Sequence, residues 1–161
     1  MKKKSISVLF VLMSTLFSFQ KLSAQHPVYA KVIEALRSNY PSETWNDKVL
    51  ALTTWNTENN TSRDINRSFA KTHSVYRVAK LKGGAKGMLL VTVCLNAANS
   101  QAIIVLNKDG VSNSIVIPYE SLSAVMDTNP ANWVFDSSGK LLFGNLMQDQ
   151  VQESIHGLIT R

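Results

Sequence analysis

The sequence has only one cysteine, Cys94, among its 161 residues. A single thiol excludes an internal disulfide, so burial of apolar side chains must stabilise the fold. The three histidines, His26, His73 and His156, are far apart and have no neighbours at metal-ligand spacing. We therefore expect no metal site and no other cofactor.

The sequence also lacks a phosphate-binding loop and a run of apolar residues long enough for a membrane helix. The stretch KGGAKG, 82–87, has no closing Lys-Ser or Lys-Thr and precedes a predicted strand, so we interpret it as a turn. The uncharged run at 5–19 has 15 residues, whereas a helix that crosses a bilayer needs about 20.

The first 24 residues have the pattern of a secretory signal peptide. Three lysines follow Met1, the apolar run comes next, and Ala24 precedes the predicted cleavage point. We expect 1–24 to be removed and the protein to be exported, to the periplasm or outside the cell. A retained membrane anchor is the alternative, which the short run disfavours.

The charge balance changes when 1–24 are set aside. The chain has 17 Lys and Arg and 11 Asp and Glu, and four of the basic residues lie in 1–24. The remaining 13 basic and 11 acidic residues give a net charge of +2. This balance predicts no nucleic-acid partner and, after signal cleavage, no membrane partner.

Hydrophobic periodicity predicts alternating helices and strands in the remaining 137 residues, enough for one domain. Helices are expected at 27–40, 59–81, 98–107 and 147–159, with one or two helical turns at 119–127. Strands are expected at 47–55, 87–96, 112–118, 129–136 and 141–145. This order predicts an α/β fold with a central, mostly parallel sheet, an antiparallel C-terminal hairpin and helices on both faces.

The stretch WNTENNTSR, 55–63, resembles the active-site segment of TlpA-like thiol-disulfide oxidoreductases. In that family a strand ending Trp-Ala-x-Trp runs into Cys-x-x-Cys-Arg at a helix start. Trp55 and Glu58 stand at the two tryptophan positions, and Asn59 and Ser62 stand at the two cysteine positions. Arg63 takes the place of the basic residue.

Three other stretches resemble the same family. NPANWVFDSSGKLLFGNL, 129–146, is similar to Pro-Thr-x-Phe-x-Ile-Asp-x-x-Gly-Lys-Ile, which places Pro130 on the family's cis-proline. LLVTVCLN resembles the strand that ends in Ser-x-Asp, and NKDGV resembles the Lys-Asp-Gly loop before the next strand. The resemblance implies a thioredoxin-like fold, with a signal peptide at 1–24, an N-terminal helical extension at 25–46 and a thioredoxin-like domain at 47–161.

The departures from the family imply that the chain has no dithiol redox chemistry and no catalytic residue. Disulfide exchange needs a thiolate nucleophile and a second thiol that resolves the mixed disulfide. Asn59 and Ser62 supply neither. Many members of the family also have a buried acid six residues before the first cysteine, where this sequence has Thr53.

The old active-site face could still bind a protein or peptide, because binding needs no cysteine. The candidate face comprises Trp55, Glu58, Asn59, Asn60, Thr61, Ser62, Asn129 and Pro130. Each group also has a purely structural interpretation. Trp55 suits a core, 59–62 suit a helix cap, and Pro130 suits the first residue of an edge strand.

We therefore expect a binding or structural module of the cell envelope whose partner is an unknown protein or peptide. Two alternatives stay open. One is a redox enzyme that uses the single thiol of Cys94, although alternation with Val91 and Val93 favours a core position for that residue. The other is a small-molecule binder in a groove beside Trp55 and Pro130.

Overall fold

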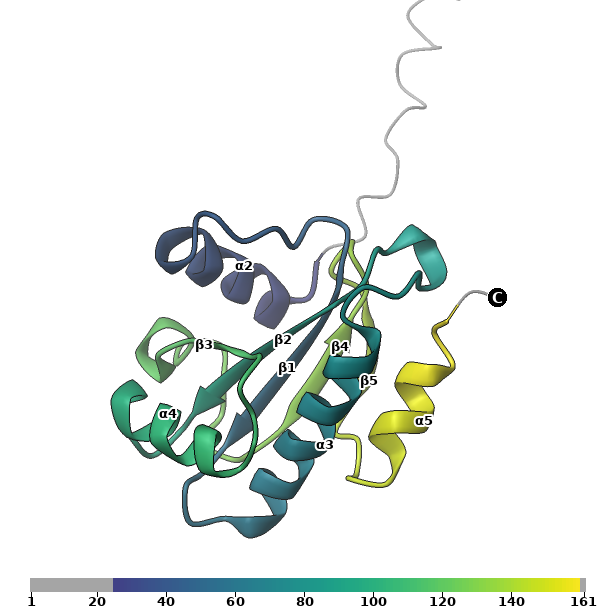
Figure 1. Ribbon diagram of the computed structural model, residues 1–161. Coiled ribbons are helices and arrows are strands. Elements are labelled where there is room, and N and C mark those ends of the chain that lie inside the picture. The colour runs from purple at the N-terminus through teal and green to yellow at the C-terminus, as the bar shows by residue number, and fades with distance from the viewer. Residues whose placement is uncertain (1–24, 160–161) are drawn as a thin grey trace, which may run out of the picture.

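The computed structural model describes residues 25–159, so the predicted signal peptide at 1–24 lies outside the described residues. A five-stranded sheet with the order β3-β2-β1-β4-β5 forms its centre (Figure 1). Its strands are β1 (Val49–Trp55), β2 (Met88–Cys94), β3 (Ile115–Val116), β4 (Asn132–Phe135) and β5 (Leu141–Gly144). The pairings β1–β2 and β2–β3 are parallel, whereas β1–β4 and β4–β5 are antiparallel. The predicted α/β class with an antiparallel C-terminal hairpin is confirmed.

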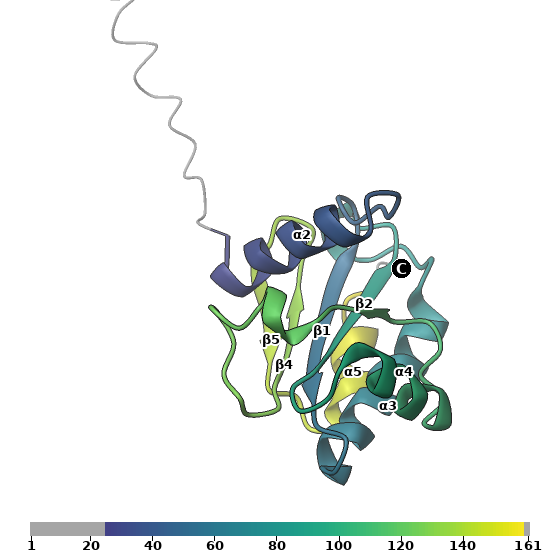
Figure 2. The ribbon, with the colours of Figure 1, turned by 90° about the vertical axis from the view of Figure 1, so that its left-hand side faces the viewer.

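Strands β1 and β2 are buried along their whole length, which explains their near-continuous apolar sequences. Their alternate residues point to opposite faces of the sheet, and each face has its own cover. Helices α3 (Asn60–Tyr76) and α5 (Gln150–His156) lie side by side on one face, and α2 (Pro27–Asn39) covers the other (Figures 1 and 2).

Helix α4 (Asn99–Lys108) packs on the same face as α3, near the carboxyl ends of the strands. Its Ala102 and Leu106 form a small cluster with Trp55 and Cys94, the last residues of β1 and β2. None of the helices at 25–159 is both long and apolar enough to span a bilayer.

Helix α2 is part of the main core rather than an appendage. Its buried side chains pack on Leu50 and Leu52 of β1 and on Phe135 of β4. Beyond the helix, the Tyr40 hydroxyl donates a hydrogen bond to the Val116 carbonyl, at 2.7 Å. The segment 25–46 therefore closes one face of the sheet.

The long helix predicted at 59–81 ends earlier than expected, at Tyr76. The chain then turns so that Leu81, which is buried, forms a β-bridge with Ile159. This tertiary pairing overrides the local helical pattern. Tyr76, the last residue of α3, is buried, whereas Val75 and Val78 are exposed.

Candidate functional site

Helix α3 begins directly after the loop that follows β1, where the resemblance places the cysteine pair. The Asn59 side chain caps this helix by accepting a hydrogen bond from the Ser62 amide, at 2.9 Å. In return the Ser62 hydroxyl donates to the Asn59 carbonyl, at 2.9 Å, and accepts from the Asn56 amide, at 3.2 Å. The two residues at the cysteine positions are thus locked together by hydrogen bonds, and Ser62 is buried.

Thr53 stands where many TlpA-like oxidoreductases have a buried acid, and its side chain forms a hydrogen bond with another uncharged side chain. Its hydroxyl donates to the Asn66 side-chain oxygen on α3, at 2.8 Å, and the Thr92 hydroxyl approaches the same oxygen at 3.4 Å. All three residues are buried. None of them titrates near neutral pH, so this cluster cannot carry a proton to or from the helix start.

Arg63 ties the start of α3 to the turn after α4. Its guanidinium holds the Asp109 carboxylate in a fork, with Nε–Oδ2 at 2.9 Å and Nη2–Oδ1 at 2.6 Å. Arg67 lies 3.2 Å from the same carboxylate and also pairs with Asp64. The hydrogen bond from Arg63 lowers the pKa of Asp109, whereas burial opposes this shift. Sequence reasoning matched Arg63 and Asp109 to separate family motifs but did not predict that they meet.

Pro130 lies at the same end of β1, but the predicted cis bond is wrong: residues 25–159 contain no cis peptide bond. The chain instead runs extended from Pro130 into β4. The Thr54 amide donates to the Ala131 carbonyl at 2.8 Å, and the Ala131 amide donates to the Thr54 hydroxyl at 2.7 Å. This pairing holds the loop against β1 with the ordinary trans geometry.

The candidate face is divided between exposed and buried residues. Glu58, Asn59, Asn60, Thr61 and Asn129 are exposed, and Pro130 is half-buried. Trp55 is 0% exposed, so it supports the face from within the core. Both parts of the face lie at the carboxyl end of β1, because Thr53 pairs with Asn132 in the sheet register. No hydrogen bond between described residues joins 59–62 to Asn129 or Pro130.

Several backbone groups on this face have no hydrogen-bond partner among residues 25–159. They include the amides of Asn60 and Thr61, in the first turn of α3, and the amide of Asn129. Groups of this kind can pair with carbonyl or carboxylate oxygens of a partner.

The lone thiol is buried beside the face. Cys94 pairs with Trp55 in the sheet and is 2% exposed. Its Sγ lies 3.5 Å from the Asn96 side-chain oxygen, which also accepts a hydrogen bond from the Thr57 amide at 2.9 Å. The predicted core position of Cys94 is confirmed.

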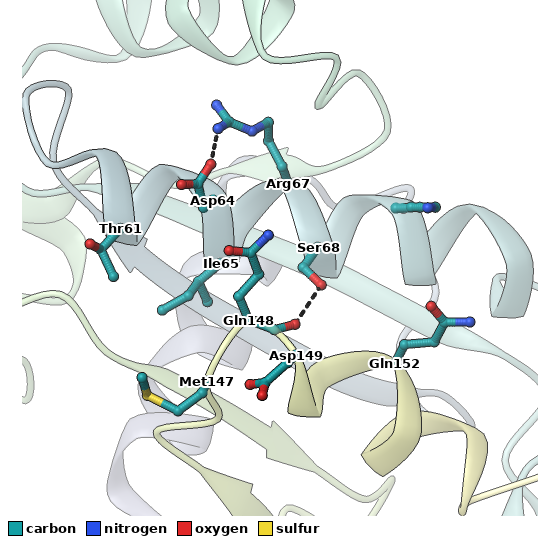
Figure 3. A pocket seen from close by; sticks show the side chains of 10 residues that line it. Thr61, Asp64, Ile65, Arg67, Ser68, Met147, Gln148, Asp149 and Gln152 are labelled. Atoms are coloured by element: carbon teal, nitrogen blue, oxygen red, sulfur yellow. Dashed lines mark hydrogen bonds and ion pairs between the residues drawn. The ribbon is translucent and has the colours of Figure 1, made fainter.

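A groove of about 510 Å³ opens next to Thr61, between α3 and the loop before α5 (Figure 3). Its walls mix charged and apolar side chains, including Asp64 and Ile65 from α3 and the exposed Met147 from the loop. The Ser68 hydroxyl on α3 donates to the Gln148 carbonyl at 3.0 Å and so connects the two walls of the groove. The groove was not predictable from the sequence, because its two walls lie some 80 residues apart in the chain. Residues 25–159 contain no cluster of three His, Cys, Asp or Glu side chains that could hold a metal.

No protein-family model and no curated protein matches this chain. Its structure, however, is similar to those of solved oxidoreductases. The thioredoxin domain of a thiol-disulfide oxidoreductase from Bacteroides vulgatus matches with a TM-score of 0.57 and 14% identity, over 72% of this chain and 82% of that one. The chain has the thioredoxin-like fold.

Two further structures extend the likeness. A thiol:disulfide interchange protein from Bacteroides sp. matches the thioredoxin-like fold with a TM-score of 0.58 and 14% identity, over 71% of this chain and 75% of that one. A putative thiol:disulfide interchange protein DsbE from Chlorobium tepidum matches with a TM-score of 0.53 and 19% identity, over 70% of this chain and 80% of that one. The predicted thioredoxin-like fold is confirmed, and the chemistry of the chain has to be inferred from its own site.

Proposed function

We propose that this chain is an exported thioredoxin-like domain without dithiol redox activity, which binds a protein or peptide segment at the carboxyl end of β1. The absence of dithiol activity is supported by the hydrogen-bonded residues Asn59 and Ser62 at the start of α3. Asn59 and Ser62 hold each other through hydrogen bonds at the two positions where a thioredoxin-like oxidoreductase needs thiols. The neutral contact between Thr53 and Asn66 removes the proton carrier as well.

Export is supported by the signal-like sequence at 1–24. It is also supported by likeness to a secreted disulfide oxidoreductase of Mycobacterium tuberculosis, which matches with a TM-score of 0.52 and 13% identity.

The binding role is supported by backbone groups that remain open on the exposed part of the face. The amides of Asn60 and Thr61 lie at the positive end of the α3 dipole, where they attract carbonyl or carboxylate oxygens. The amide of Asn129, just before the start of β4, has no partner among residues 25–159 and could pair with an extended segment as an added strand.

Insulin reduction tests the absence of redox activity. We expect the domain to give no turnover of insulin disulfides above background. Turnover that survives Cys94→Ala would overturn this account of the helix start.

Thiol labelling separates the proposal from the single-thiol enzyme. Because Cys94 is buried, we expect a thiol reagent to label it only after denaturant unfolds the protein. Fast stoichiometric labelling of the folded protein would make the single-thiol enzyme the better account.

Amide chemical shifts test the binding face. A partner captured from the native envelope is titrated into the labelled domain, and we expect shifts at 58–62 and at Asn129. Thr61→Glu should weaken the complex, because the new carboxylate repels oxygen ligands while it favours the helix dipole. Thr44→Glu, the same change on an exposed loop away from the face, serves as the control. Shifts confined to α2 or α5 would contradict the proposed face.

A further inference from the structure

The net charge of +2 hides a strong asymmetry along the chain. Residues 65–108 contain seven basic residues and no acidic residue. The rest of the chain after 1–24 contains the other six basic residues and all 11 acidic ones. Such a segment becomes a functional candidate only if the fold gathers its charges on one surface.

The structure gathers four of the seven on the segment that follows α3. Arg77, Lys80, Lys82 and Lys86 lie within ten residues, and all four side chains are exposed. Lys80 and Lys86 face each other in an antiparallel bridge, and the 3-10 turn Lys82–Gly84 connects them. We call these four residues, together with Val75 and Val78, the basic end.

Contacts to the core hold the basic end in place. The Lys82 amide donates to the Leu158 carbonyl at 2.6 Å, and the Lys86 amide donates to the Asp47 carbonyl at 2.6 Å. Gly87 has a φ of +120°, and a Cβ built there would lie 2.1 Å from the Arg77 carbonyl oxygen. Glycine is thus required at this position, because a side chain would prevent the close approach of the backbone at Gly87 to the Arg77 carbonyl.

Two apolar side chains stand among these charges. Val75, in the last turn of α3, is 64% exposed, and Val78, just after the helix, is 82% exposed. Asp47 lies beside these charges, with its carboxylate 3.4 Å from Lys86 Nζ in a solvent-exposed ion pair. A pair of this kind is weak and can open when a larger anionic surface approaches.

The basic end and the start of the described chain share one end of the sheet (Figure 1). The Val49 amide, at the start of β1, bonds to the Gly87 carbonyl. The His26 amide bonds to the Gly139 carbonyl in the hairpin turn, which the pairing of Leu50 with Phe135 places at the same end of β1. The candidate binding face lies at the opposite end.

We propose that the basic end docks on anionic lipid headgroups of a bilayer, with Val75 and Val78 entering the interface between the headgroups. The phosphates complement the basic side chains, and the two valines favour a surface with an apolar interior over a nucleic acid. Docking in this way turns the candidate binding face away from the membrane. This proposal departs from the expectation, drawn from net charge alone, of no membrane partner after signal cleavage.

Flotation with lipid vesicles tests the proposal. The chain beginning at Gln25 carries every described strand and helix, and its cooperative thermal unfolding is checked first. Vesicles contain phosphatidylcholine alone or phosphatidylcholine with phosphatidylglycerol. We expect binding to the anionic vesicles only, and weaker binding as salt increases.

Matched variants locate the surface. Each Lys or Arg near an anionic surface contributes about fivefold to affinity, so Lys82→Glu should weaken binding by about tenfold or more. Lys108→Glu makes the same charge change on α4, outside the basic end, and should change binding by less than about twofold. Val78→Ser keeps the charge and should weaken binding several-fold.

Three results would overturn the proposal. They are equal binding to both kinds of vesicle, an equal loss with Lys108→Glu and Lys82→Glu, and binding to a DNA duplex without binding to vesicles. The last result would make the basic end a nucleic-acid surface. Because the variants leave Asn60, Thr61 and Asn129 unchanged, these outcomes are independent of the peptide-binding proposal.

Discussion

Asn59 and Ser62 have a structural role at the start of α3, at the positions that the resemblance assigns to two cysteines. A helix start that lowers the pKa of a cysteine thiol also exposes amides that need acceptors. An asparagine at the first position satisfies one of these amides, and a serine at the second returns a hydrogen bond to the asparagine carbonyl. The two side chains therefore stabilise the start of α3.

The capping role of Asn59 can be measured directly. Asn59→Ala should lower the free energy of unfolding by about 1 kcal/mol, because the Ser62 amide loses its acceptor. Asn60→Ala is the control, since the Asn60 side chain is exposed and makes no hydrogen bond to another described residue. Urea unfolding measures both changes, and equal losses would contradict the capping role.

His73 makes the stability of the protein depend on pH. The side chain is 3% exposed, and this burial lowers its pKa. The positive charges of Arg77 and Lys48 lower the pKa further, whereas a hydrogen bond to the Met88 backbone raises it. The unfolded chain binds this proton near the ordinary pKa of about 6.5, whereas the folded chain binds it only at lower pH. The unfolded state therefore holds more protons in that window, and stability falls as the pH falls through it.

We expect the free energy of unfolding to decrease between about pH 7 and pH 5, and His73→Gln to reduce this decrease. Urea unfolding at a series of pH values gives both slopes. His26 and His156 remain in both proteins, so the difference between the slopes isolates His73. Parallel slopes would show that His73 does not titrate differently on folding.

At the scale of elements, the fork between Arg63 and Asp109 joins α3 to the turn after α4. These residues lie 46 positions apart, and the Asp109 side chain is only 8% exposed. Removal of one partner from a pair like this leaves the other charge partly buried without compensation.

Asp109→Asn should lower the free energy of unfolding by about 1–3 kcal/mol. Asp149→Asn, on the exposed carboxylate before α5, should change it by less than about 0.5 kcal/mol. Because the pKa of Asp109 is lowered in the folded state, its contribution is present above about pH 4 and is lost as the pH falls through the lowered pKa. Chemical unfolding at neutral and acidic pH measures these effects. If Asp109→Asn lowers the free energy of unfolding by the same amount at both pH values, the predicted pH dependence is wrong.

Elements with strong local patterns were predictable from the sequence. The apolar runs of β1 and β2 and the spacing of Val28, Val32 and Leu36 in α2 identified their type and approximate position. The end of α3 was not predictable, because the bridge between Leu81 and Ile159 decides it across 78 positions.

The candidate site was predictable only in part. Residue types at 59–62 indicated a helix cap, but the cis geometry expected for Pro130 rested on the family and is absent here. The Arg63–Asp109 fork and the groove beside Thr61 arise from long-range packing, for which a single sequence carries no local signal.

At the scale of the whole molecule, α2 covers one face of the sheet together with Ile117, Leu122 and Met126 from the segment after β3. Its buried residues share a core cluster with Leu50, Leu52, Val91 and Phe135. Burial of five large apolar side chains contributes about 8–15 kcal/mol, comparable to the total stability of about 5–15 kcal/mol that is usual for a domain.

A chain that begins at Asp47 should therefore fail to fold, although the thioredoxin-like region was predicted to start there. We expect loss of cooperative thermal unfolding and strong binding of a hydrophobic dye, whereas the chain beginning at Gln25 should unfold in one sharp transition. A folded, monomeric product from the shorter chain would show that α2 is dispensable.

The described chain starts and finishes at one end of the sheet, with His26 bonded to Gly139 and Ile159 bridged to Leu81. An affinity tag or a fused reporter at either terminus would consequently project from the side that carries Lys82. Immobilised on a sensor chip through such a tag, the domain would present Asn60, Thr61 and Asn129 to the flowing solution, whereas Lys82 would face the chip.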